Sequence, residues 1–187
     1  MSRIFRRPAT VIAGLSAMLV AVGAGFVGTA NAAAPYCGIT WGSLAKAGGT
    51  ASEAALGNVR TGRQACFDRV VFDFAGSANG YRVEYVSEVR TDGEGRRLSV
   101  AGGAVLRVNL QANVFDQLGH LHYARAIGDH VADVRGYPTL RDVVYGGCFE
   151  GRTTFGVGVR ARLPFRVFTL AGPGSSSRIV LDVAHRW

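Results

Sequence analysis

The sequence predicts an all-β domain, folded as an antiparallel β-sandwich or a partly closed barrel with one long excursion. Two observations predict this fold class. From Cys66 onward, apolar side chains alternate with polar ones at a period of two rather than 3.6. Short glycine-rich stretches, such as Gly102-Gly103 and Gly146-Gly147, separate these runs as turns separate strands. Alternation over short runs is typical of antiparallel strands that bury one face.

The first 32 residues have the three-part layout of a secretory signal. Three arginines form a basic start, an apolar run covers residues 11–27, and Ala30-Asn31-Ala32 has the small-x-small form that signal peptidase cleaves. The run is shorter than the about 20 apolar residues that a permanent span needs. We therefore expect export through the Sec route, removal of residues 1–32 and no transmembrane anchor afterwards.

The remaining residues, 33–187, have the length of one domain. The signal carries three of the 21 basic residues and none of the 13 acidic ones. Residues 33–187 therefore contain 18 basic and 13 acidic residues, and their net charge is +5. An exported basic protein is attracted to anionic wall polymers. Nucleic acid is a poor alternative, because the basic residues are interspersed with acids and no groove-binding motif is present.

Three cysteines follow the signal, at positions 37, 66 and 148. Outside the cytosol, one disulfide and one remaining thiol are the simplest arrangement. Spacing alone allows all three pairings. We expect Cys37–Cys66, which would tie the N-terminal segment to the first strong strand.

The elements follow in order along the chain. Residues 33–58 are small and polar, and we expect them to be less regular, with a weak helical stretch near residues 51–56. The excursion at about 111–141 is polar and without a clean period, and it has room for a short helix. The strands are expected at residues 69–74, 80–86, 104–110, 142–145, 153–163, 165–170 and 178–183.

One seven-residue pattern occurs twice, from Arg69 and again from Arg178. Each copy places an arginine and an aspartate four residues apart on one face of a strand, opposite three apolar residues. We interpret the copies as two similar strands with solubilising outer faces, on which Asp73 and Asp182 balance the two arginines.

Six stretches of the chain together carry a family resemblance. The most specific of them is Phe149–Phe168, which runs FEGRTTFGVGVRARLPFRVF. The others are Trp41–Ser43, Val59–Gly62, Cys66–Asp73, Gly80–Val86 and Val180–Trp187. Together they resemble the AMIN-like domain family of exported actinobacterial cell-envelope proteins. The resemblance implies a small β-sandwich in the cell envelope and, by analogy with AMIN domains, a role in binding peptidoglycan. It supplies no catalytic residues.

The strand at 153–163 carries the strongest candidate for a binding face. Alternation places two glycines and two arginines on its outer side. The glycines leave the backbone bare, and each guanidinium beside them can donate two parallel hydrogen bonds to a carboxylate or a phosphate. The alternative is that the glycines mark a bulge or close packing. With two flanking arginines, the candidate ligand-binding residues are Arg152, Gly156, Gly158, Arg160, Arg162 and Arg166.

A metal site is a weaker candidate. His120 and His122 share one face of an extended chain, with Asp116, Asp129 and His130 nearby in sequence, and such residues can hold zinc. Their spacing matches no ligand motif. We expect a polar surface loop and no metal or other cofactor.

The sequence favours a catalytic role less than a binding role. Cys148 could act as a nucleophile only beside a base, and its flanking residues lack a histidine-bearing signature. An acid pair drawn from Asp73, Glu84, Glu150 and Asp182 would have to meet across a cleft. We therefore expect no catalytic residues.

The sequence thus predicts a non-catalytic envelope module that binds peptidoglycan or an associated anionic glycan. Two alternatives stay open: a module that docks an envelope enzyme, and a cysteine- or metal-dependent wall hydrolase.

Overall fold

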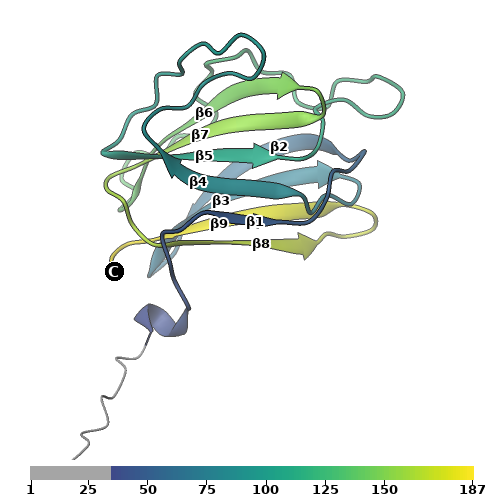
Figure 1. Ribbon diagram of the computed structural model, residues 1–187. Helices are drawn as coiled ribbons and strands as arrows, with labels where there is room; N and C mark the ends of the chain where they lie inside the picture. Colours follow the sequence, from purple (N-terminus) through teal and green to yellow (C-terminus); the bar gives the residue numbers. More distant parts are fainter. Residues whose placement is uncertain (1–34) are drawn as a thin grey trace, which may run out of the picture. The chain divides into compact units, whose positions relative to one another are not determined.

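The computed structural model describes residues 35–187, which form two antiparallel sheets packed face to face (Figure 1). The predicted export signal lies outside the described residues. The architecture is a sandwich and not a closed barrel, which confirms the first of the two predicted forms. Among the described residues, no helix is long and apolar enough to cross a membrane.

Each sheet is built only from antiparallel neighbours. A short 3-10 helix, η1 (Tyr36–Gly38), precedes the strands. The five-stranded sheet has the order β1 (Lys46–Gly48), β4 (Tyr81–Val86), β5 (Ala104–Leu110), β7 (Arg152–Val159) and β6 (Leu140–Phe149). The four-stranded sheet has the order β2 (Ala55–Arg63), β3 (Phe67–Ala75), β9 (Ser177–Ala184) and β8 (Phe165–Ala171).

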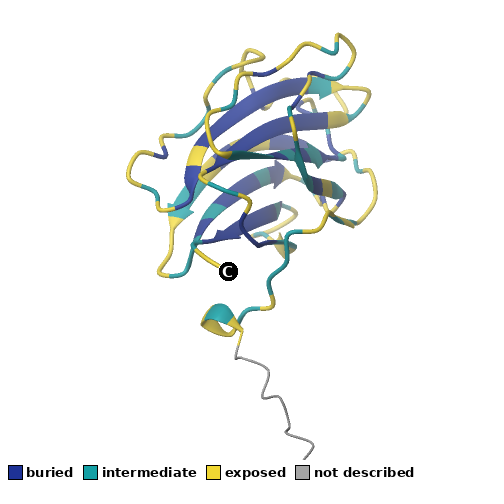
Figure 2. Cartoon of the chain, turned by 60° about the vertical axis from the view of Figure 1, so that its left-hand side comes forward, coloured by how far each residue is buried: buried dark blue, intermediate teal, exposed yellow. Residues whose placement is uncertain are grey.

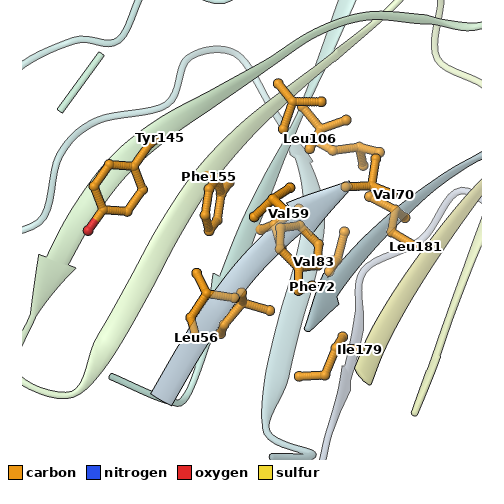
Figure 3. Packing of buried hydrophobic residues seen from close by; sticks show 14 of the residues in the cluster. Leu56, Val59, Val70, Phe72, Val83, Leu106, Tyr145, Phe155, Ile179 and Leu181 are labelled. Atoms are coloured by element: carbon orange, nitrogen blue, oxygen red, sulfur yellow. The ribbon is translucent and has the colours of Figure 1, made fainter. Parts of the chain in front are cut away.

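The core lies between the sheets and consists of the apolar half of each alternating strand (Figures 2 and 3). Phe72 of β3 and Phe155 of β7 are fully buried, and their ring centroids lie 5.1 Å apart across the sandwich. Such offset aromatic pairs add to the free energy that burial itself contributes. Val70, Phe72 and Phe74 are buried in this core, as the alternation in the strand predicted at residues 69–74 requires.

The excursion between β5 and β6 is folded against the sandwich. Val114, Tyr123 and Val134 are buried, and the Tyr123 ring lies edge-on to Tyr145 at 5.4 Å. The Tyr137 hydroxyl donates to Thr61 Oγ1 at 3.1 Å. Residues 111–139, all described, contain no helix, so the expected short helix is wrong. The excursion is therefore held in place by its buried side chains and by contacts to Tyr145 and Thr61, and not by a helix of its own.

Several elements differ from the prediction in their bounds, and β1 was not predicted. The expected helical stretch at 51–56 is wrong, because Ala55 and Leu56 begin β2 and pair with β3. β6 is longer than predicted, because its residues from Leu140 to Phe149 pair with β7. Residues 128–131 add hydrogen bonds along its other edge, at Val143 and Tyr145. β7 ends at Val159, where the chain bends before the next strand.

The disulfide joins Cys37 to Cys66, as expected. It ties η1, of which Cys37 is the middle residue, to Cys66, the residue before β3. Cys148 is the free cysteine of the described residues.

Candidate functional site

The predicted glycine face on β7 is covered rather than open. Gly156 and Gly158 are both buried. A Cβ atom at Gly158 would lie 1.8 Å from the carbonyl oxygen of Ala101, and one at Gly156 would lie 2.6 Å from Val100 Cγ2. The Asp142 carboxylate holds this covering segment by accepting the Ala101 N–H at 3.0 Å. The glycines therefore permit close packing of backbone, which is the alternative reading, and they are not available to a ligand.

The structure also separates the predicted arginines. Arg152 begins β7 and Arg160 follows its end. At a rise of about 3.3 Å per residue, the strand sets their backbones roughly 25 Å apart. Arg152 therefore lies apart from the other three.

Arg160, Arg162 and Arg166 do lie together, at a place where three chain segments meet. Arg160 Nη2 donates to the carbonyl of His185, and Arg162 Nη2 donates to that of Ser43 at 3.2 Å. We call this region the basic corner and define it as residues 41–46, 160–166 and 185–187. Two further bonds join the segments: the Phe165 N–H donates to Gly42 O at 2.8 Å and Trp187 Nε1 donates to Arg162 O at 3.3 Å.

Cationic side chains in the basic corner lie against aromatic rings. The guanidinium carbon of Arg162 is 4.8 Å from the ring centre of Tyr85, and that of Arg166 is 5.5 Å from Trp41. Trp187 is 70% exposed. Arg166 also lies 5.0 Å from the ring centre of Phe168. Further cation–ring contacts join Arg186 to Tyr36 at 4.7 Å and Lys46 to Phe165 at 4.2 Å. Stacking of this kind orients a guanidinium without consuming its in-plane N–H donors.

The basic corner is strongly cationic. Its three segments contain five basic side chains and neither aspartate nor glutamate. Arg166 reaches out of the corner to Asp182, which is fully buried and already bonded to Arg69. Burial lowers the pKa of the Lys46 ammonium. Arg166 and His185 already pair with the buried carboxylates of Asp182 and Asp68. Among the described residues, Arg160, Arg162 and Arg186 form no such ion pair, so these are the cations that an approaching anion meets. The five are Lys46, Arg160, Arg162, Arg166 and Arg186.

The histidines and acids considered for a metal site lie in two separate places. The Asp116 carboxylate lies 3.0 Å from His120 Nδ1 and 3.1 Å from His122 Nε2, and the His120 N–H is the main cause that lowers its pKa. His130 lies instead on Asp142, at 2.7 Å. Across residues 35–187, no group of three or more His, Cys, Asp or Glu is placed to hold a metal ion.

The candidate catalytic groups are likewise dispersed. Cys148 Sγ donates to Asn113 Oδ1 at 3.2 Å. Asp73 and Asp182 lie on the four-stranded sheet and Glu84 on the five-stranded one. Arg82 and then Arg107 hydrogen-bond to Glu84 and lower the pKa of its carboxyl to about 2. Glu150 occupies the tight β6–β7 turn, with a φ of 49°.

Sequence reasoning missed Lys46, Arg186 and the two tryptophans as parts of this site. None of them belongs to a pattern shared with Arg160 or Arg162. Their common place depends on where β1, β8 and the C-terminal segment meet in space, and local periodicity carries no information about that.

A model of the AMIN-like domain family matches residues 54–185. No curated protein and no solved structure matches the chain. The family relates the chain to the cell envelope, and the Cys37–Cys66 disulfide is consistent with an extracytoplasmic location. Since the match covers most of the chain, the chain belongs to the AMIN-like domain family.

Proposed function

We propose that this protein is a non-catalytic binding module of the cell envelope and that it holds peptidoglycan or an associated anionic glycan at the basic corner. The observation that carries the proposal is the gathering of five basic side chains without an acid in the same segments. The N–H donors of an arginine guanidinium are spaced to bind both oxygens of a carboxylate or phosphate, and peptidoglycan and other wall polymers provide these groups.

The aromatic rings suit the same class of ligand. Trp187 presents most of its side chain to solvent beside Arg162. An exposed indole offers a flat apolar face and a polar edge, a combination that packs against a sugar ring while its N–H keeps a hydrogen bond. Charge and ring together favour an anionic glycan over a neutral one.

The proposal is tested by co-sedimentation of the exported protein with purified sacculi at low and high salt. The test variant replaces Arg160, Arg162 and Arg186 with alanine. A charge-matched control replaces Arg96, Arg125 and Arg135, three exposed arginines outside the basic corner. Both variants lose three positive charges, so binding by charge attraction alone would weaken equally in both. Such attraction is also screened beyond about 8–10 Å near physiological ionic strength, so it would be lost at high salt.

We expect the corner variant to bind at least about tenfold more weakly and the control to bind like the wild type, with wild-type binding persisting at high salt. Equal loss in both variants, or no loss in either, would remove the basic corner as the binding surface.

A second function, the docking of an envelope protein, is supported by a different observation. Phe115, Leu118 and Leu121 are 44%, 81% and 51% exposed within one short hairpin. Apolar side chains gathered on a surface favour a protein contact. Leu118→Ser would then abolish co-purification of a partner after complete wall digestion. Leu44→Ser, at a similarly exposed leucine in the basic corner, would leave co-purification intact.

A further inference from the structure

We infer that a hollow beside Arg162 is a subsite for one sugar unit that carries an oxyanion, either a carboxylate or a phosphate. The inference rests on the proposed function and specifies the part of the ligand that is recognised. The hollow has a volume of about 490 Å³. This lies in the range of about 300–1,000 Å³ that is typical of small-molecule sites.

Two arginines line the hollow without an acidic side chain in its lining among the described residues. Arg162 uses one of its N–H donors on Ser43 O, and a guanidinium has five. Arg97 Nε lies 3.5 Å from Glu88 Oε2, and its side chain is 72% exposed. An exposed pair at this distance is weak, so Arg97 is free to turn toward an anion.

Tyr85 provides a fixed aromatic wall. Its hydroxyl donates to Leu163 O at 2.7 Å and accepts the Leu163 N–H at 3.0 Å. Its ring lies edge-on to Phe165, with 5.6 Å between the ring centres, and the Arg162 guanidinium lies over it. Burial raises the pKa of the Tyr85 phenol, which keeps the wall uncharged. A site whose ring and cation are already placed loses little conformational entropy on binding.

The rim of the hollow connects it to the basic corner. Gly102 and Gly103 form part of the lining and leave the main chain bare. A Cβ atom at Gly103 would lie 2.3 Å from the carbonyl oxygen of Arg160, so the glycine allows the rim to touch the corner directly. With Arg162 common to both, a polymer that lies on the corner can place one unit in the hollow.

The test is an NMR titration of the exported, 15N-labelled protein with three separate compounds: N-acetylmuramic acid, glucose 1-phosphate and neutral N-acetylglucosamine. The chain has two tryptophans, and the indole N–H of Trp187 donates to Arg162 O, so that indole signal reports on the subsite. Arg97→Ala is the test variant. Arg96→Ala is its control, because Arg96 is the exposed neighbour that does not line the hollow.

We expect a saturable shift of the Trp187 signal with at least one anionic sugar and a much smaller one with N-acetylglucosamine. Arg97→Ala should weaken the anionic response about tenfold and Arg96→Ala should not. A response to the muramic acid alone identifies a carboxylate source, and a response to the sugar phosphate alone identifies a phosphate source. No response to either anion, an equal response to the neutral sugar, or indifference to Arg97→Ala would overturn the subsite.

The outcome is separable from that of the proposed function. If sacculus binding depends on Arg160, Arg162 and Arg186 while no small sugar shifts Trp187, the basic corner stands and the subsite fails. If sacculus binding ignores the corner variant, the proposed function fails whatever the titration shows.

Discussion

Arg69 and Asp182 face each other across β3 and β9, with Arg69 Nε 2.6 Å from Asp182 Oδ1 and Arg69 Nη2 2.9 Å from Oδ2. They belong to the two copies of the repeated seven-residue pattern. The strand register pairs Arg69 with Asp182 and Asp73 with Arg178. Because the strands are antiparallel, one pattern read in opposite directions sets each arginine opposite the other copy's aspartate. The copies are nevertheless unequal, since Asp182 is fully buried and shared with Arg166, whereas Asp73 is partly exposed and bonds to Arg60.

Because the two aspartates differ in burial, the same substitution should lower the free energy of unfolding by different amounts at Asp182 and at Asp73. Asp182→Asn should lower the free energy of unfolding by about 3 kcal/mol, because it leaves two arginines without their carboxylate. Asp73→Asn should cost less than about 1 kcal/mol, as for exposed pairs. Urea unfolding of both variants measures the difference. Equal costs would show that burial does not distinguish the two sites.

The covered glycines on β7 predict a steric effect. Gly158→Ala would place a methyl group against the Ala101 carbonyl and force the covering segment away, at a cost of about 1–3 kcal/mol or more. Gly57→Ala on β2 is the control, because its Cβ would meet only Asp73 O at 3.8 Å. Thermal unfolding is the measurement. A Gly158→Ala protein as stable as the control would mean that residues 100–101 do not pack on β7.

The disulfide predicts a loss of stability on removal. Replacing Cys37 and Cys66 with serine should cost about 2–4 kcal/mol, mainly by releasing a constraint on the unfolded chain. Urea unfolding checks this. The Cys148→Ser protein is the control, because that thiol is free, and it should unfold close to the wild-type midpoint.

Glu84 predicts a dependence of stability on acid pH. Arg82 and Arg107 lower the pKa of its carboxyl from 4.5 to about 2 in the folded protein. The unfolded chain therefore takes up the proton first as the pH falls. The contribution of Glu84 is complete above about pH 4.5 and disappears as the pH falls to about 2.

Glu84→Gln should consequently be less stable than the wild type at pH 7, by about 1 kcal/mol, and equally stable near pH 2. Urea unfolding at a series of pH values measures both. A difference that stays constant down to pH 2 would mean that packing rather than charge holds the Glu84 side chain.

Much of the sandwich follows from the sequence because the alternation of a strand is a local property. Successive side chains point to opposite faces, so a run such as Val70 to Phe74 reveals its buried side without any knowledge of its neighbours. β2 and most of β6 were missed because their apolar and small residues lack that alternation. The pairing of β2 with β3 and of β6 with β7 makes them strands.

The candidate site shows the opposite case. The sequence by itself determined the strand pattern, the family resemblance and the arginines of the 152–166 region. Only the tertiary structure decided that Gly156 and Gly158 are covered, that Arg152 lies apart, and that Lys46 and Arg186 join Arg160 and Arg162. The physical reason is that a strand's pattern says which face is apolar, while exposure and charge clustering depend on segments such as 100–101 and 185–187 that arrive from elsewhere in the chain.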